Sequence, residues 1–320
     1  MNIGHLRRGL ATATATALIG VLSFAAPALA QSNDKQPVFA LISHAAPGDT
    51  FWDIERKGAE AAADKLGARL IYAHNPAASQ QATLVDNVIN QKVDGIALTL
   101  SHPDAMKSAV AKANRAGIPV IGLNSGLNEW KKTGVFAYIG QDPVVAGRAY
   151  GERLNTVGAK HVLCVNHEQG NVSLARRCEG IEKGFEGKTT ILYVNGQDMT
   201  SVRSRILAKL QQDPSIDYIA TLGSPFAMTS LRAVRMSGRQ VEVTTFDLDE
   251  RVVKAIQSGK IRWAVDQQPY LQGYLAIQSL WLKATNGNVI GGGQAVLTGP
   301  AFVTKDNVAQ VAEFAARGTR

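Results

Sequence analysis

The stretch "DGIALTLSHPDAMKSAVAKANRAGIPVIGLNSG" (Asp94–Gly126) contains two kinds of pattern in alternation. Apolar runs rich in β-forming residues stand at Ile96–Leu100 and Val120–Leu123, and a helical pattern covers Ala105–Ala116 between them. A strand, a helix and a strand in this order form a unit whose strands lie parallel while the helix covers one face of the sheet. A parallel sheet with covering helices is therefore predicted.

The same order of elements recurs later in the chain. "IDYIATLGSPFAMTSLRAVRMSGRQVEVTTFDLD" (Ile216–Asp249) repeats it, and each copy follows a shorter β-rich run, "LIYAHNP" from Leu70 and "ILYVNGQDM" from Ile191. Because 320 residues exceed what one core usually spans, we predict an α/β fold of two similar, doubly wound parallel-sheet lobes. The remaining predicted elements are strands at Val38–Ile42, Val162–Val165, Tyr218–Leu222 and Val243–Phe246, and helices at Phe51–Leu66, Gln80–Gln91, Val202–Gln211 and Ala227–Met236.

The first thirty residues differ from the rest. A basic "HLRR" precedes the charge-free run Leu10–Phe24, and "APALA" ends at Ala30 with small residues typical of a cleavage site. The apolar run is shorter than the roughly 18–20 residues that a membrane span needs, which makes a retained anchor helix the weaker alternative. Residues 1–30 are therefore predicted to be a signal peptide, and no cysteine follows that could carry a lipid. The free periplasm of a Gram-negative cell is the expected location.

Charge and cysteine content limit the classes of partner. The 34 basic and 26 acidic residues are scattered along the chain, which does not indicate nucleic-acid binding. The two cysteines, Cys164 and Cys178, are close in sequence, and in an oxidising compartment a disulfide is expected, with two buried thiols as the alternative. No metal site is expected, because only His167 lies near them.

Parallel sheets bind ligands at the carboxyl ends of their strands. Following the predicted strands, this rule selects side chains rich in hydroxyl, amide and carboxylate groups, which suit a polar, neutral ligand with several hydroxyls. The selected residues are His44, Asp49 to Trp52, Thr99, Ser101, Asn124, Ser125, Asn166, His167, Gly223, Ser224 and Asp247.

Phe51 and Trp52 stand at the start of a helix whose core face is already supplied by residues such as Ile54 and Leu66. The two rings differ by about 100° around the helix, so at least one is expected to face the crevice at the strand ends. An aromatic face beside carboxylates and amides suits a sugar, whose C–H face stacks while its hydroxyls form hydrogen bonds. The alternative is that both rings fill the core of the lobe.

Three further types of side chain could bind hydroxyls. Asp247 could accept two hydrogen bonds as a carboxylate, and its alternative role as a helix cap suits Asp249 better. Arg177 offers fixed donors, although a surface position like that of its neighbour Arg176 is the alternative. Amides that both donate and accept are Asn124 and Gln267.

Signals of catalysis are absent from the sequence. It contains no G-x-S-x-G, no H-E-x-x-H, no P-loop and no G-x-G-x-x-G after a strand. The neighbours His167 and Glu168 are expected to be a solvated pair in a loop. We therefore expect no catalytic residue, no metal ligand, no cofactor and no enzymatic activity.

Several motifs in order along the chain carry a resemblance. "GDTFW", "AGIPVIGLNS", "IGQDPVVAGRAYGE", "ARRCEGIEKGF", "VTTFDLDE" and "DQQPYLQGYLA" together resemble the sugar-binding periplasmic proteins of ABC importers, the ribose-binding-protein-like type I group. The resemblance implies a monomer of two lobes joined by three crossing segments, with residues 31–141 plus 268–297 in one lobe and 142–267 plus 298–320 in the other.

The resemblance also implies a function. A small sugar or polyol would bind between the lobes and be delivered to a membrane permease with its ATPase subunit. A periplasmic sensory receptor for a sugar-like signal, acting in chemotaxis or on a furanosyl signal molecule, is the alternative.

The site residues carry over position by position. Asp49 stands where ribose binders have asparagine, and Phe51 and Trp52 stand where they have two phenylalanines. The motifs also align Arg177, Asp247 and Gln267 with an arginine, an aspartate and a hinge glutamine of that group. Where ribose binders have an Asp-Arg pair, this chain departs from them, and it also gains a histidine; we therefore expect another pentose or hexose, or a short sugar alcohol. Ribose binders also have an asparagine in the second lobe where this chain has glycine. The departing positions are Asn124, Ser125, Gly223 and His44.

Overall fold

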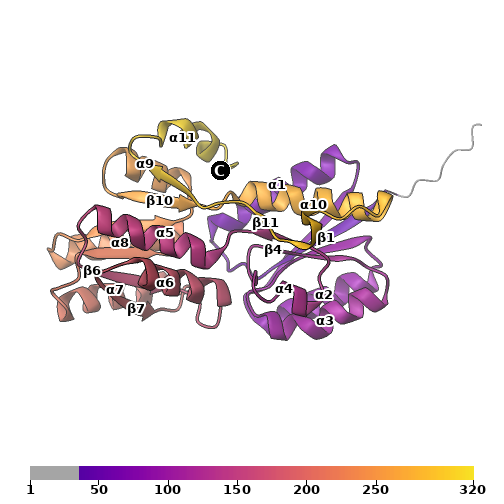
Figure 1. Cartoon of the computed structure of the whole chain (residues 1–320), viewed down its shortest axis with the longest axis horizontal. Coiled ribbons are helices and arrows are strands. Elements are labelled where there is room, and N and C mark those ends of the chain that lie inside the picture. Colours follow the sequence, from indigo (N-terminus) through magenta and orange to yellow (C-terminus); the bar gives the residue numbers. More distant parts are fainter. Residues whose placement is uncertain (1–35) are drawn as a thin grey trace, which may run out of the picture. The chain divides into compact units, whose positions relative to one another are not determined.

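The computed structural model of the chain describes residues 36–320, which form one compact unit. This part contains two six-stranded sheets, each covered by helices on both faces, and these are the two lobes (Figure 1). The predicted α/β fold with two doubly wound lobes is confirmed. The predicted signal peptide, residues 1–30, lies outside the described residues. Between residues 36 and 320, no helix has both the length and the apolar character needed to cross a bilayer.

The N-terminal lobe has the strand order β11-β5-β4-β3-β1-β2, and every neighbouring pair is parallel. Its elements are β1 (Val38–Ser43), α1 (Thr50–Lys65), β2 (Arg69–His74), α2 (Ala78–Asn90), β3 (Gly95–Thr99), α3 (Pro103–Arg115), β4 (Val120–Leu123), α4 (Trp130–Thr133), β5 (Tyr138–Gly140), α10 (Pro269–Asn286), the short 3-10 helix η1 (Gly291–Gly293) and β11 (Val296–Leu297).

The C-terminal lobe has the order β12-β10-β9-β8-β6-β7, in which only the β10–β12 pair is antiparallel. Its elements are α5 (Pro143–Thr156), β6 (His161–Asn166), α6 (Val172–Gly184), β7 (Lys188–Tyr193), α7 (Met199–Gln212), β8 (Tyr218–Thr221), α8 (Ser224–Ser237), β9 (Glu242–Phe246), α9 (Glu250–Gln257), β10 (Trp263–Asp266), β12 (Ala301–Thr304) and α11 (Ala309–Ala316).

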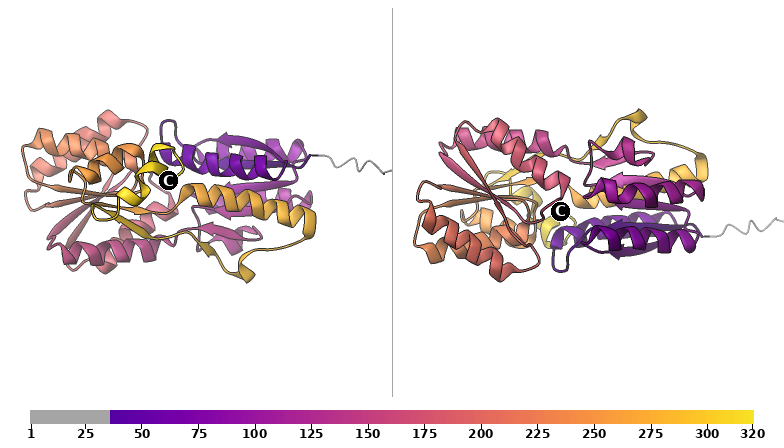
Figure 2. Two further views of the ribbon diagram at one scale, coloured as in Figure 1. Left: turned by 90° about the horizontal axis from the view of Figure 1, so that it is seen from above. Right: turned by 90° about the horizontal axis from the view of Figure 1, so that it is seen from below.

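The chain passes between the two lobes three times, after β5, after β10 and after β11 (Figure 2). The boundaries expected from the sequence, at 141/142, 267/268 and 297/298, fall within these three connections. We keep them as the proposed limits of the lobes. The three connections lie next to one another, since Gly299 is close to Gln141, Asp266 and Gln267. Adjacent connections allow the lobes to rotate about them as a hinge.

The first residues of the helices differ more from the positions predicted by the sequence than the ends of the strands do. The patterns placed two helices at Ala105 and Ala227, whereas α3 begins at Pro103 and α8 begins at Ser224. Proline fits the first turn of a helix, because its missing N–H needs no partner there. Apolar periodicity begins only after that turn, and for this reason it locates the start too late.

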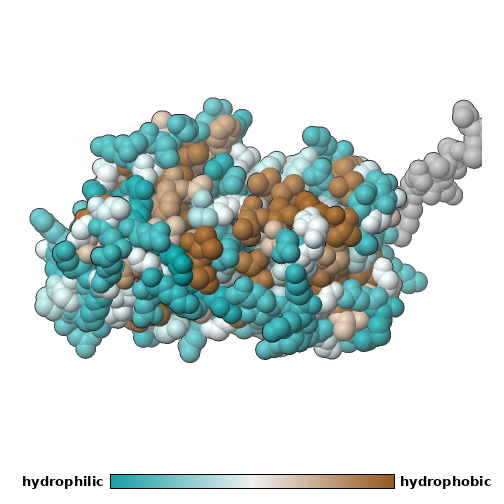
Figure 3. All heavy atoms as spheres, in the orientation of Figure 1, coloured by the Kyte–Doolittle hydropathy of each residue, from teal (hydrophilic) through white to brown (hydrophobic). Residues whose placement is uncertain are grey.

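Both sheets are buried on both faces, as parallel sheets generally are. In β1, Phe39 and Leu41 pack into the helix layer of α1 and α10, and Ile42 packs into the opposite layer of α2 and α3. Most of the visible surface is hydrophilic, and apolar residues gather over α10 and β11 (Figure 3). Leu271 and Leu297 are among the exposed large apolar side chains.

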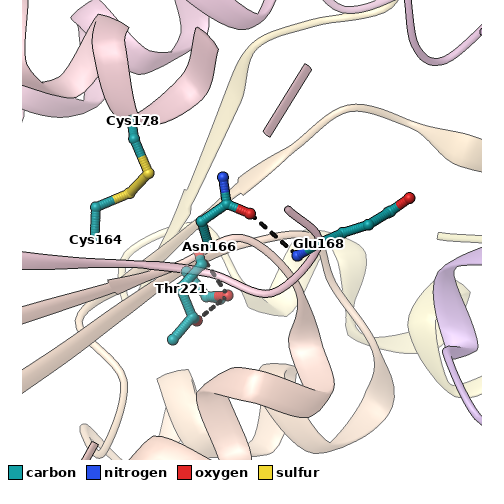
Figure 4. Close-up of a disulfide and its surroundings, with 6 residues drawn as sticks. Cys164, Asn166, Glu168, Cys178 and Thr221 are labelled. Atoms are coloured by element: carbon teal, nitrogen blue, oxygen red, sulfur yellow. Dashed lines mark hydrogen bonds between the residues drawn. A yellow bond between two sulfur atoms is a disulfide. The ribbon is translucent and has the colours of Figure 1, made fainter. Parts of the chain in front are cut away.

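A disulfide joins Cys164 of β6 to Cys178 of α6, with a Cα–Cα distance of 6.0 Å (Figure 4). Of the two states left open by the sequence, the structure has the bridged one. The bond ties α6, the helix that carries Arg177, directly to β6, the strand next to the edge strand β7.

Removing this bond should lower the stability of the protein. Because the disulfide restricts the unfolded chain, the double variant Cys164→Ala/Cys178→Ala is expected to lose about 2–3 kcal/mol of unfolding free energy. Urea denaturation followed by circular dichroism measures this difference. The wild-type protein in reductant is the matched control and should shift in the same direction. An unchanged midpoint in both samples would show that the bond does not contribute.

Helices α5 and α6 cross at very short range through glycines. A Cβ atom added at Gly180 would lie 2.6 Å from the carbonyl oxygen of Val144 and 2.8 Å from the Cα of Gly147. Both distances are shorter than real Cβ contacts, and both involve backbone atoms that cannot move aside. The two helix backbones therefore touch directly, which fixes α6 and its side chains against the lobe.

Candidate functional site

A buried cavity lies between the two lobes at the carboxyl ends of the strands, and its lining includes all nine binding residues predicted from the sequence. Its volume is about 40 Å³, far below the roughly 300–1,000 Å³ typical of small-molecule sites, so the lobes must separate for a sugar-sized molecule to enter. The nine residues are His44, Asp49, Phe51, Trp52, Asn124, Ser125, Arg177, Asp247 and Gln267.

Phe51 and Trp52 form the aromatic wall on the N-terminal lobe. Asp49 caps α1 by accepting the N–H of Phe51 at 3.1 Å, so the helix starts with both rings at the cavity. The rings meet edge to face, with centroids 4.9 Å apart, and they form a small buried cluster with Ala45. Both rings line the cavity, so neither is simply a plug of the lobe's main core. Burial raises the pKa of Asp49 to about 6.

His44 is held as a neutral ring by contacts at both of its nitrogens. Its Nδ1 lies 2.7 Å from Oγ1 of Thr99, and that oxygen already accepts the backbone N–H of His44 and the amide of Gln81, each at 3.0 Å. The other ring nitrogen, Nε2, lies 3.3 Å from the Nδ2 amide of Asn171, a group that can only donate. Burial lowers the pKa of His44 to about 3, so the ring stays uncharged at neutral pH. Nε2 points across the cavity to the second lobe, 3.9 Å from Glu168.

Two strands at equivalent places in the lobes end in the same unusual way. Asn124 follows β4 with φ 62°, and Asp247 follows β9 with φ 68°, a left-handed conformation that few residues other than glycine adopt. Such strained residues cluster at functional sites. Here the conformation accompanies two polar side chains that enter the cavity from opposite lobes.

Arg177, Asp247 and Gln267 form the polar wall. The Gln267 amide donates to Oδ1 of Asp247 at 2.7 Å and accepts from the Asn124 amide at 3.3 Å, which links the lobes through the hinge. The Arg177 guanidinium lies 4.8 Å from the centroid of the Phe246 ring, and its Nε has no partner in the protein. Burial raises the pKa of Asp247 to about 7, although the charge of Arg177 opposes the shift.

The structure corrects the expectation that His167 and Glu168 are solvated. Both line the cavity, and the Glu168 side chain is 24% exposed, with Oε1 buried and without a partner. Asn166, at the end of β6, accepts the N–H of Glu168 at 3.1 Å, and the Glu168 side chain extends away from the strand (Figure 4). Oε2 accepts from Asn171, the cap of α6, at 2.9 Å. No local sequence signal identifies these contacts, because they depend on how the α6 cap meets the loop after β6.

Glu168 should make stability depend on pH. Burial raises its pKa from 4.5 to about 7, so the protonated form favours the folded state, and this stabilisation is lost as pH rises from about 4.5 through 7. Glu168→Gln keeps an acceptor for Asn171 and removes the charge, so it should be more stable than wild type at pH 8 by about 1–3 kcal/mol and nearly equal at pH 4.5. Urea titrations at both pH values measure this; an equal difference at both would contradict the assignment.

Direct contacts join the lobes around the cavity. Arg176, the neighbour of Arg177, is half-buried and pairs with Glu129 of the other lobe at 3.1 Å. On the same side, the N–H of Val172 donates to the carbonyl of Ser101 at 3.1 Å. Arg176 thus lies at the rim, and Arg177 lines the cavity. Of the two positions that the sequence left open for Arg177, a surface position and a place in the crevice, the structure has the second. Asp249 caps α9, as expected, which leaves Asp247 free for the cavity.

The cavity is lined by hydrogen-bonding groups and aromatic rings. Within residues 36–320 no group of three or more His, Cys, Asp or Glu is placed to hold a metal ion. Carboxylates, amides and a guanidinium surround an aromatic wall, which is the arrangement that matches hydroxyl groups on a ring with an apolar face.

Comparison with known proteins agrees with this geometry. The model of the periplasmic binding protein domain matches residues 39–288. The chain belongs to the periplasmic binding protein family. A solved carbohydrate transporter from Acidothermus cellulolyticus 11B, in complex with myo-inositol, is 51% identical, with a TM-score of 0.88 over 89% of this chain and 100% of that one.

More distant relatives of this periplasmic binding protein bind other sugars. The ribose import binding protein of Haemophilus influenzae is 27% identical over 71% of this chain and 79% of its own. The xylose/arabinose-binding protein of Sulfolobus acidocaldarius is 26% identical over 72% of this chain, which spans 62% of that protein. The chain is thus a solute-binding protein of the sugar-import type and not an enzyme.

Proposed function

We propose that this periplasmic binding protein binds a neutral cyclic polyol in the cavity between its lobes, and that myo-inositol is the leading candidate. The observation that carries the proposal is the lining itself, in which an aromatic pair from one lobe faces carboxylate, guanidinium and amide groups from the other. The likeness to the structure with myo-inositol supports this choice of ligand.

Each side chain then has a role in the proposal. Phe51 and Trp52 cover the C–H face of the ring, while Asp49 and Asp247 accept hydroxyl hydrogens. The Arg177 Nε, which lacks a protein partner, donates to a ligand oxygen. The remaining donors and acceptors are His44, Asn124, Ser125 and Gln267.

A neutral ring fits the departures from ribose binders. Asn124 and Ser125 are uncharged where those proteins have an ionic pair, so the N-terminal lobe offers an amide and a hydroxyl to the ligand. Each of these groups both donates and accepts, and so does every hydroxyl of a polyol.

Binding and closure are coupled in this proposal. The ligand contacts both lobes only when they are together, so it shifts the hinge equilibrium toward the closed form. The closed protein then delivers the ligand to the membrane permease of an ABC importer with its ATPase subunit. We further propose that residues 1–30 are cleaved on export and that the protein acts in the periplasm as a monomer.

A ligand screen tests the proposal. A ligand that binds only the folded state stabilises it, so myo-inositol at 100 times its Kd should raise Tm by about 5 °C or more. Ribose, arabinose and xylitol are the comparison compounds, and isothermal titration calorimetry gives each Kd. Binding of ribose tighter than that of every polyol tested would contradict the proposed ligand class.

A further inference from the structure

A second, larger cavity opens between the lobes and reaches the surface; we call it the vestibule. Its volume is about 620 Å³, within the roughly 300–1,000 Å³ range of small-molecule sites. The proposed function uses only the inner cavity and leaves the vestibule without a role. Residues that line the vestibule and not the inner cavity include Pro47, Pro76, Tyr193, Asn195, Met199 and Phe226.

The vestibule adjoins the inner cavity. Five residues line both spaces and form the wall that they share. A ligand with one ring in the inner cavity could carry a substituent past them into the vestibule. The shared residues are His44, Asp49, Trp52, His167 and Glu168.

The lining of the vestibule matches the chemistry of a second sugar ring. Tyr193, the last residue of β7, is 43% exposed, and Met199 is 37% exposed, so two large apolar surfaces remain uncovered in a concave place. Such surfaces pack against the C–H face of a sugar. Asn195 and Gln197 stand between them in sequence and supply amide donors and acceptors.

Glu168 lies where the two rings would join. Its Oε2 is bonded to Asn171, but its Oε1 is buried without a partner. Because Glu168 lines both spaces, this oxygen can accept a hydroxyl from either ring. A buried acceptor of this kind favours a ligand that satisfies it.

The charges favour a neutral substituent over a phosphate. Two carboxylates, Asp49 and Glu168, line the vestibule, against the single guanidinium of Arg205. Arg205 is exposed to solvent, whereas Asp49 lies at the inner wall. A dianionic phosphate ester would meet more negative than positive charge there.

We propose that the vestibule is a second subsite that binds a hexose joined to the cyclitol, so that the protein also accepts hexosyl cyclitols. This inference rests on the proposed function of the inner cavity. The subsite would extend the range of substrates from free cyclitols to their neutral glycosides.

Calorimetry with two compounds and two variants tests the inference. Galactosyl-myo-inositol should bind the wild-type protein within about tenfold of the Kd for myo-inositol and should compete with it. Tyr193→Ala should weaken the glycoside about tenfold and change the Kd of myo-inositol less than twofold. Phe314→Ala is the matched control, because this aromatic side chain is also 43% exposed and does not line the vestibule; it should change neither Kd.

Each other outcome overturns the inference in a recognisable way. If myo-inositol binds and the glycoside does not, the second subsite is excluded while the proposed function stands. An equal effect of Tyr193→Ala on both compounds would also exclude it, as would tighter binding of inositol 1-phosphate than of the glycoside. If no cyclitol binds, the proposed function fails and this inference fails with it.

Discussion

Arg177→Ala should weaken the binding of myo-inositol at least about 100-fold. A hydrogen bond to a charged group contributes about 1.5–3 kcal/mol, and the guanidinium can make two or more with a ring of hydroxyls. The substitution also removes the positive charge near the buried carboxyl group of Asp247. Ligand oxygens would then enter a cavity wall that has lost its positive charge. Isothermal titration calorimetry at pH 7.5 measures the change.

The neighbouring residue provides the control for this prediction. Arg176→Ala removes the same side chain one position away, but Arg176 lies at the rim and contacts Glu129 instead of lining the cavity. It should alter Kd less than tenfold. Circular dichroism and Tm of both variants establish that they fold. Similar losses for the two variants would show that Arg177 acts through lobe closure and not through the ligand.

Gly180→Val should destabilise the protein by about 3 kcal/mol or more. In an ordinary helix interior, glycine is less favourable than valine, so the substitution alone would be expected to stabilise the helix. Here a Cβ would lie 2.6 Å from the backbone of α5, and the two helices would have to separate. Overpacking of this kind costs about 1–3 kcal/mol and sometimes more, and the rigid backbone contact places this site at the upper end.

Chemical denaturation of Gly180→Val measures this effect against a control on the same helix. Ala175 lies on the exposed face of α6, so Ala175→Val adds a larger side chain to the helix without a clash. It should change the unfolding free energy by less than about 0.7 kcal/mol, the range of helix propensities. If the two variants lose equal stability, the close approach of α5 and α6 does not limit residue size.

Much of the fold could be predicted because the strands are fully buried. Runs such as Ile96–Leu100 and Val120–Leu123 are continuous and apolar, and their repetition in the second half shows two lobes. The short edge strands β11 and β12 could not be found in this way. Val296–Leu297 has two residues, too few for any periodicity, and its pairing with β5 depends on the third crossing between the lobes.

The site could be predicted where one strand end determines the position of a side chain. Asn124 and Asp247 follow central strands directly, so the rule for parallel sheets locates them. Glu168 and Asn171 could not be predicted, because their places depend on a loop and a helix cap that meet in space. The sequence also leaves the form of the ligand open, since hydroxyl partners of this kind serve open-chain and cyclic polyols alike.

The disulfide has a consequence for recognition, because it anchors the residue next to Arg177. Cys178 fixes the backbone of α6 on β6, so the helix that carries Arg177 is held in place before any ligand arrives. The Arg177 side chain is also buried, so it loses little further freedom on association, where ordering a long side chain costs about 0.5–1.5 kcal/mol. Reduction of the disulfide would release α6 from β6 and thereby weaken ligand binding, so an oxidising compartment favours the tightly binding form of the protein.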